Sequence, residues 1–463
     1  MIFEQPSPKY QAEYSKIDLA PRYHGHPYIE ALPRFANSKS VMTSLKRTIR
    51  VDPLERECRA SERIGFLADI NQVFWPLQRD GLLFETIQAN MFELYRSIAI
   101  EVPNFSRRVL NGRVKLDSAS ERLRPGILLV LGGSGLGKST SINRCLSLIP
   151  RVIEHHTYDG AQFRVKQIPW LKVDYSYTNN TGAIVREIAN SLYSKLYPSG
   201  AYNLHLGGKT APDTSLDNLA SDLVRHGTVV IVLDNTEQAI SMGDNDISKT
   251  QSFLLNLVEK LAVLLIVVGT PELRDAILSD KRIMRRCNDN PIDTWDPISG
   301  EDWDSFIRNM WKCQFLAEPT PLTQDVKDTF FALTQGHPAM TRDLFKHAQQ
   351  RAILAHVAGA STEVITPSLL VEVKNEFVRS GTWIESPDTN ESLTDDDSQR
   401  PRKVRSKAQK VIPTTADDQL MELEVTATAS LMSELSAIAK TGRATGDVLE
   451  SHGVGSNLDF DEG

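Results

Sequence analysis

Cysteine is scarce in this sequence, with four residues among 463, and the four lie far apart. Cys58, Cys145, Cys287 and Cys313 form no C-x-x-C pair, so neither a disulfide framework nor a zinc site is expected, and reduced thiols are the default. Long apolar runs are also missing, because none approaches the roughly 20 residues of a membrane-spanning helix. The opening residues MIFEQPSPKY lack the features of a signal peptide. These absences predict a cytoplasmic protein without membrane contact.

A strong charge of one sign is missing from most of the chain. The formal net charge is −7, and the residues after 385 carry most of the acidic excess. The residues before them are close to neutral, so a local basic surface for nucleic acid is not excluded. A chain of this length is expected to bury a large core and to form two or three domains.

The chain divides into regions with different patterns. Residues 1–105 begin with an arm rich in Pro, Tyr and His and continue with apolar stripes at helical spacing. Two interpretations of the arm, which covers residues 1 to about 40, stay open. It is either a poorly ordered terminus or a segment that docks on a neighbouring subunit or partner.

Residues 106–298 alternate short apolar strands with helices, which predicts an α/β fold with a parallel sheet buried on both faces. The expected strands are GILLVLG, QFRVKQI, PWLKVDYS, TVVIVLD and AVLLIVVGT. Residues 299–384 carry only helical patterns and are expected to form an α-helical lid.

The composition changes again in residues 385–463. An acidic block is followed by a basic one with almost no large apolar residues, which is typical of disorder. Within 416–439, apolar residues recur at helical spacing and predict one amphipathic helix. That helix either binds a partner or packs back on its own domain.

The segment GGSGLGKS fits the phosphate-binding pattern G-x-x-x-x-G-K-[ST], and it follows a predicted strand and opens a predicted helix. Its glycines let backbone N–H groups point at phosphate, and the helix adds its positive N-terminal end. Lys138 is expected to reach the β- and γ-phosphates and Ser139 to ligate magnesium. The residues expected around the nucleotide are Gly132, Gly133, Ser134, Gly135, Leu136, Gly137, Lys138, Ser139 and Thr140.

A second strand, TVVIVLD, ends in Asp234, as strands do when they deliver a carboxylate to a magnesium ion. Many nucleotide-hydrolysing proteins of this build place a glutamate directly after that aspartate, but here the next residue is Asn235. An acid returns at Glu237, which either orients the attacking water or is a solvated residue at a helix start. Asn235 can position water but is a poor base. We therefore predict slow hydrolysis instead of a fast motor.

The P-loop, the strand to Asp234, VVGTPEL, the paired arginines of RRC and the helix of TQGHPAMTRDLFKHA together resemble an AAA+ ATPase. With HPYIEALP near the N-terminus, they resemble more narrowly the TnsC/TniB family of transposition regulators. The core of the resemblance covers residues 120–350. The region after 385 shows no match.

The resemblance implies residue roles. Thr270 corresponds to the first sensor of the γ-phosphate and Arg342 to the second. Arg286, or its neighbour Arg285, corresponds to the finger that enters an adjacent subunit's site and stabilises developing charge on phosphate. For Arg285 and Arg286, the alternative to a finger is an ordinary surface salt bridge. For Arg342, the alternative to a sensor is a purely structural role.

The resemblance also implies a function. Proteins of this family bind ATP and Mg²⁺ and form homo-oligomeric rings or helical filaments on double-stranded DNA without sequence preference. They connect a target selector of the TniQ or TnsD type to the transposase TnsB or TniA, with TnsA, in the bacterial cytoplasm. The family can include members that work with an RNA-guided complex.

Contact with DNA is harder to assign from the residues. A surface that follows phosphates needs Lys and Arg on one face, and its binding is salt-dependent. The candidates are Arg164, Lys166, Lys172 and Arg186. Ordinary surface charge is the alternative for each of them.

Two other functions compete. One is an AAA+ initiator or loader of a replicative helicase, which often appends a winged-helix DNA reader that is not seen after the lid here. The other is a signalling P-loop NTPase, a class that usually carries long repeat arrays, and none is visible. ATP-dependent assembly on plain duplex DNA would distinguish a transposition regulator from a signalling NTPase. Copurification with a transposase, as opposed to a replicative helicase, would distinguish it from a helicase loader.

Overall fold

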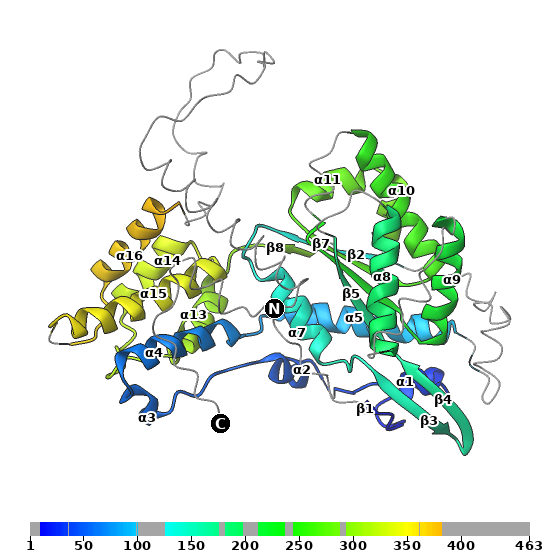
Figure 1. Cartoon of the computed structure of the whole chain (residues 1–463), viewed down its shortest axis with the longest axis horizontal. Coiled ribbons are helices and arrows are strands. Elements are labelled where there is room, and N and C mark those ends of the chain that lie inside the picture. The colour runs from blue at the N-terminus through cyan, green and yellow to red at the C-terminus, as the bar shows by residue number, and fades with distance from the viewer. Residues whose placement is uncertain are drawn as a thin grey trace, which may run out of the picture. The chain divides into compact units, whose positions relative to one another are not determined.

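The structure, a computed structural model of the whole chain, describes most of the residues before 382 (Figure 1). The described ranges are 10–100 without 36 and 99, 126–175, 181–197, 212–236, 244–287, and 293–381 without 361. The predicted tail 385–463, with its expected helix 416–439, lies outside them. Among the described residues, no helix has both the length and the apolar content needed to cross a bilayer. All four cysteines are free thiols.

A parallel sheet forms the centre of the fold. Its five strands run in the order β5-β6-β7-β2-β8, and every pairing is parallel. The strands are β2 (Ile127–Gly132), β5 (Trp170–Asp174), β6 (Val230–Asp234), β7 (Leu264–Gly269) and β8 (Asp293–Trp295). Every residue of β2, β6 and β7 is buried, as expected of strands covered on both faces. The predicted α/β fold with a parallel sheet is confirmed.

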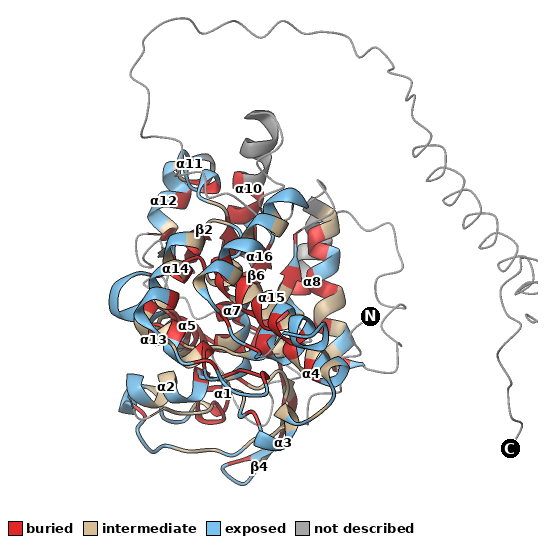
Figure 2. Ribbon diagram, turned by 90° about the vertical axis from the view of Figure 1, so that its left-hand side faces the viewer, coloured by how far each residue is buried: buried red, intermediate tan, exposed pale blue. Residues whose placement is uncertain are grey.

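Helices cover both faces of this sheet, and alternate residues of each strand point to opposite faces. Leu128 and Val130 share a core with α5 and α7, whereas Leu129 and Leu131 share another with α8, α10 and α12. Figure 2 shows buried residues on the strands and on the inner sides of these helices. The helices of the two faces are α5 (Gln78–Arg96), α7 (Lys138–Ser147), α8 (Thr181–Leu196), α9 (Pro212–Arg225), α10 (Asp244–Leu261), α11 (Glu272–Leu278) and α12 (Lys281–Cys287).

A second, three-stranded sheet stands apart from the first. It has the order β1-β3-β4, with β1 (Tyr10–Gln11) parallel to β3 (Ile153–Tyr158) and β3 antiparallel to β4 (Ala161–Gln167). The segment QFRVKQI was expected in the parallel sheet, and this placement was wrong. Asp159 and Gly160 turn the chain with φ of 46° and 77°, so β4 returns directly beside β3 as a hairpin.

The described part of the N-terminal arm packs on its own chain from Tyr10 onward, so the interpretation as a poorly ordered terminus is wrong for it. Docking on a neighbouring subunit or partner stays a prediction. Tyr28 and Ile29 in α1 (Pro27–Glu30) are fully buried in the core that also holds α5. The Tyr28 hydroxyl donates to the Arg225 carbonyl oxygen at 2.5 Å. The arm's aromatic and apolar side chains bury enough surface to hold it in place. A 3-10 turn η1 (Pro21–Tyr23) and α2 (Ser38–Leu45) complete this part.

The helices that follow the arm belong to a different core. The segments α3 (Pro53–Arg56), α4 (Ala60–Phe66) and η2 (Leu67–Gln72) pack with the predicted lid, where Leu67 and Ile70 join its apolar cluster. The lid helices are α13 (Gly300–Met310), α14 (Gln324–Thr334), α15 (Pro338–Val357) and α16 (Pro367–Arg379). The described residues before 100 are therefore divided between the α/β core and the lid.

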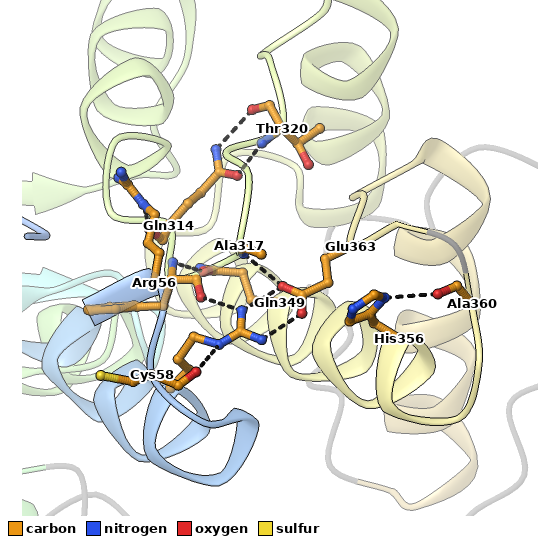
Figure 3. A network of polar contacts seen from close by, with 11 residues as sticks. Arg56, Cys58, Gln314, Ala317, Thr320, Gln349, His356, Ala360 and Glu363 are labelled. Carbon is orange, nitrogen blue, oxygen red and sulfur yellow. Dashed lines mark hydrogen bonds and ion pairs between the residues drawn. The ribbon is translucent and has the colours of Figure 1, made fainter. Parts of the chain in front are cut away.

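A buried ion pair joins α4 to the lid. Arg63 donates to both carboxylate oxygens of Glu363 at 2.6 Å, and both side chains are almost fully buried. The Ala317 N–H also donates to Glu363 at 2.8 Å, and Figure 3 shows Glu363 beside Ala317 within a wider polar network. In the same network, Arg56 donates to the Gln314 carbonyl oxygen at 3.1 Å. These contacts hold the N-terminal helices and the lid together.

Candidate nucleotide site

The glycine-rich loop links the buried strand β2 to α7, as its pattern predicts. Gly135 and Gly137 have φ of 78° and 94°, a backbone region in which glycine is favoured, and Gly137 caps α7. Lys138 is buried, and its ammonium donates to the carbonyl oxygens of Gly132 and Gly133 at 2.6 and 2.8 Å. The loop, the lysine and the helix end therefore surround one small region that suits an anion.

Asp234 and Ser139 meet at this loop although they come from different elements. The Ser139 hydroxyl donates to Asp234 Oδ1 at 2.9 Å, and Asp234 is only 4% exposed at the end of β6. A serine hydroxyl and a carboxylate are the hard oxygen donors that Mg²⁺ prefers, so these two residues fit a magnesium ion.

Lys172 reaches the same aspartate from β5. Its ammonium lies 2.7 Å from Asp234 Oδ2 and donates to Asn143 Oδ1 at 2.8 Å. Lys172 was expected to contact DNA, but its charge is engaged at the nucleotide site by a buried carboxylate. Its expected contact with DNA stays a prediction.

Asn235 follows Asp234 and adopts a left-handed backbone with φ of 57°, which asparagine tolerates better than most residues. Its backbone N–H donates to Asp234 Oδ1 at 3.1 Å. Its side-chain amide donates to Asp174 Oδ1 at 2.6 Å. Glu237, the expected water-orienting acid, lies outside the described residues.

A cavity of about 270 Å³ opens beside the loop. Its lining combines the loop, Asp234 and Asn235 with a second, apolar set of side chains from the segment before α5, from β8 and from the lid. The residues of this apolar wall are Ile70, Val73, Phe74, Trp75, Leu77, Trp295, Ile298, Phe306 and Met310. Polar loop groups and apolar side chains in one cavity lining suit a phosphorylated ligand with a planar, weakly polar group.

The apolar wall was not foreseen from the sequence. Phe74 is held by a two-way backbone pairing with Arg47, at 2.9 and 2.8 Å. The Arg79 guanidinium stacks 4.3 Å from the centre of the Trp295 ring, which it meets from α5. The only local signal was the aromatic pair in VFWPLQR directly before α5, and it does not reveal that β8 lies opposite.

The start of α15 touches the loop directly. His337 Nε2 donates to the Ser134 carbonyl oxygen at 2.8 Å, and the Ala339 N–H donates to the Gly135 carbonyl oxygen at 3.3 Å. Burial lowers the pKa of His337, and the charge of Lys138 lowers it further, so the ring is neutral near pH 7. A side chain at Gly135 would lie 2.6 Å from the His337 ring, so glycine is required there. Arg342, one turn further, lines the cavity.

The remaining sequence-predicted residues lie away from the cavity lining. The Thr270 side chain hydrogen-bonds Glu272 and lowers the pKa of that carboxyl, and Thr270 is not among the lining residues. On α12, Arg286 pairs with Glu259 at 2.9 Å, whereas Arg285 is exposed. Their roles stay predictions.

Of the DNA candidates left, Arg164 and Lys166 lie on one face of β4, because side chains two residues apart on a strand share a face. Arg164 is exposed, and Lys166 donates to the Leu196 carbonyl oxygen at 3.3 Å. Arg186 is exposed on α8. Their contact with DNA stays a prediction.

Comparison with known proteins identifies the α/β part of the chain. Residues 122–277 match the family described as "AAA domain". No curated protein matches the chain.

The fold is remotely similar to several solved structures. Cdc6p from Pyrobaculum aerophilum is 19% identical, with a TM-score of 0.37 over 60% of this chain and 68% of that one. The Aeropyrum pernix ORC2 protein in its ADP form is 12% identical, with a TM-score of 0.37 over 58% of this chain and 66% of that one. The Aeropyrum pernix ORC1 protein in complex with DNA is 15% identical, with a TM-score of 0.36 over 63% of this chain and 70% of that one. The family match and the loop geometry together show that residues 122–277 form an AAA-type P-loop domain.

Proposed function

We propose that this protein is an ATP-dependent AAA+ regulator of DNA transposition that hydrolyses ATP slowly. The observation that carries the nucleotide part is the meeting of Lys138, Ser139 and Asp234 at one loop, closed on one side by His337 of the lid. The transposition part rests on the resemblance of the sequence motifs to the TnsC/TniB family.

Each residue of the site has a role in this proposal. The N-terminal end of α7 and Lys138 bind the β- and γ-phosphates, and Arg342 reaches them from the lid. Ser139 and Asp234 would hold Mg²⁺, which would neutralise phosphate charge. The aromatic wall around Phe74 and Trp75 takes the base of the nucleotide.

Slow hydrolysis follows from Asn235. A neutral amide accepts a proton far less readily than a carboxylate, so the residue after Asp234 cannot serve as a general base. We propose that hydrolysis limits the lifetime of an assembly and does not drive movement along DNA.

The proposed partners follow from the same resemblance. The protein assembles as a homo-oligomeric ring or helical filament on double-stranded DNA without sequence preference. It receives a target selector of the TniQ or TnsD type and presents the site to the transposase TnsB or TniA, with TnsA, in the bacterial cytoplasm. Thr270 acts as a γ-phosphate sensor, and Arg164, Lys166 and Arg186 contact DNA phosphates.

Electron microscopy of the purified protein with duplex DNA tests this proposal. Rings or filaments are expected with ATP or a non-hydrolysable analogue and not with ADP. Lys138→Ala should abolish both ATP binding and assembly, because the phosphates lose their buried cation. Assembly that Lys138→Ala leaves unchanged would refute nucleotide gating. ATP binding without assembly on DNA would favour a signalling NTPase, and copurification with a replicative helicase would favour a loader.

A further inference from the structure

Two aspartates end neighbouring strands at the carboxyl edge of the parallel sheet. Asp174 of β5 and Asp234 of β6 are direct partners in the register of the two strands. Side chains at the ends of adjacent parallel strands lie close together, and ligands of α/β folds bind at this edge. The sheet therefore brings a second carboxylate beside the magnesium aspartate.

Both carboxylate oxygens of Asp234 already have partners within the chain. Its Oδ1 accepts hydrogen bonds from the Ser139 hydroxyl and the Asn235 N–H, at 2.9 and 3.1 Å. Its Oδ2 lies 2.7 Å from the Lys172 ammonium. Both oxygens of this buried group are engaged, so Asp234 is not free to orient the attacking water.

Asp174 is placed for that task through Asn235. Asn235 lines the cavity and donates its side-chain amide to Asp174 Oδ1 at 2.6 Å. Asp174 is exposed at the strand end, and its Oδ2 has no partner among the residues that the structure describes. The amide thus fixes the orientation of the carboxylate and leaves one oxygen available for water.

We propose that Asp174 supplies the carboxylate that is missing after Asp234, with Asn235 as its positioning residue. The adjacent strand provides the acid and position 235 provides the amide that orients it. This inference rests on the proposed ATPase function and names the residue that handles water in it.

The reaction balances without a further reactant. Water donates a hydrogen bond to Asp174, and its oxygen attacks the γ-phosphorus of ATP. The bond from the γ-phosphorus to the bridging oxygen breaks, and its electron pair stays on ADP. The water proton passes to Asp174 and from there to solvent. The products are ADP and inorganic phosphate.

Asp174→Asn tests the proposal, with Asp159→Asn in the turn between β3 and β4 as its matched control. Both changes are nearly isosteric and remove one carboxylate. Binding of a fluorescent ATP analogue, the melting temperature and single-turnover hydrolysis are measured for each variant. We expect Asp174→Asn to keep binding within about twofold and to lower hydrolysis at least about 100-fold, the usual contribution of general base catalysis. Asp159→Asn should hydrolyse ATP like the wild type. Glu237→Gln, which removes the acid that the sequence suggested, should lower hydrolysis less than Asp174→Asn does.

A second variant separates catalysis from structure. An asparagine at 174 can still accept the amide of Asn235, so a purely structural Asp174 would leave hydrolysis unchanged in Asp174→Asn. If Asp174→Asn lowers the melting temperature, Asp174→Glu keeps the charge and should retain more hydrolysis than the asparagine variant. Wild-type hydrolysis by Asp174→Asn, or loss of hydrolysis confined to Glu237→Gln, would overturn the inference. Wild-type protein that binds no nucleotide would instead overturn the proposed function.

Discussion

At the residue scale, a lysine from outside the P-loop motif adds its charge to the candidate nucleotide site. Lys172 pairs with Asp234 at the position proposed for a divalent cation, and Asn143 on α7 holds the lysine there. Removing one partner of a buried pair leaves the other charge uncompensated. The state of Asp234 therefore depends on which cation is next to it, an ammonium or a metal ion.

Replacing Lys172 should change the magnesium requirement. In Lys172→Met, no ammonium competes for Asp234, so half-maximal binding of a fluorescent ATP analogue should occur at a several-fold lower Mg²⁺ concentration. Lys166→Met, on β4 and bonded to the Leu196 carbonyl oxygen, is the control and should not shift the titration. A higher magnesium requirement in Lys172→Met would show that the lysine assists the metal.

A second residue-scale prediction concerns pH. His155 is buried between the Tyr14 hydroxyl and the Gln167 side chain, at 2.8 and 2.9 Å, and burial lowers its pKa to about 4. The unfolded chain binds a proton near pH 6.5 and the folded chain does not. The free energy of unfolding should therefore fall by up to about 3 kcal/mol as the pH drops from 6.5 to 4.

Chemical denaturation at several pH values checks this loss. His155→Gln should flatten part of the pH dependence, because glutamine does not titrate. Burial lowers the pKa of His26 to about 4 as well, so a residual slope is expected in the variant. An unchanged slope would show that His155 contributes nothing to it.

At the element scale, short segments join parts that lie far apart in sequence. The start of α15 bonds the P-loop through His337 and Ala339, so the lid responds to the loop's conformation. The segment between α4 and α5 packs in the lid core, and its residues Phe74 and Trp75 line the cavity. A ligand in the cavity therefore contacts the α/β core, the lid and the N-terminal region together.

The ion pair of Arg63 and Glu363 should matter strongly for stability. Glu363→Ala leaves a buried guanidinium without its carboxylate and should lower the free energy of unfolding by about 3 to 5 kcal/mol. Glu376→Ala removes the carboxylate of the exposed pair with Arg351 and should cost at most about 1 kcal/mol. Denaturant melts of both variants make the comparison. Equal losses would mean that the buried pair stabilises the fold no more than the exposed pair does.

At the scale of the whole molecule, the proposed assembly needs an arginine that reaches a neighbouring subunit. Arg286 is committed to Glu259 of α10, with 20% of its side chain exposed, whereas Arg285 is exposed beside it. An arginine that enters a neighbouring subunit's site has to give up its contacts within its own subunit. Arg286 would have to break its ion pair with Glu259, whereas exposed Arg285 would not.

We expect Arg285→Ala to lower ATP hydrolysis of the DNA-bound assembly at least about 100-fold, because an arginine finger stabilises charge on the transferred phosphate. ATP binding by the monomer should not change, since α12 contributes no residue to the cavity lining. Arg286→Ala is the control and should have the smaller effect. The reverse order would assign the finger to Arg286 and show that its pair with Glu259 opens on assembly.

Patterns that are local in sequence were sufficient for much of this protein. Glycine spacing located the P-loop, and apolar runs located β2, β6 and β7. Each depends on residues within a few positions of one another, so the chain alone carries them. The parallel sheet followed from the alternation of these strands and helices.

Only the tertiary structure decided which residues meet. Strand register set Asp174 beside Asn235 and brought Lys172 to Asp234, and no local pattern records a register between strands. The same holds for the aromatic wall of the cavity and for α4, which close packing assigned to the lid. The sequence by itself determined that a nucleotide site exists. The packing of distant segments determined which charges surround it, because such contacts depend on the whole chain.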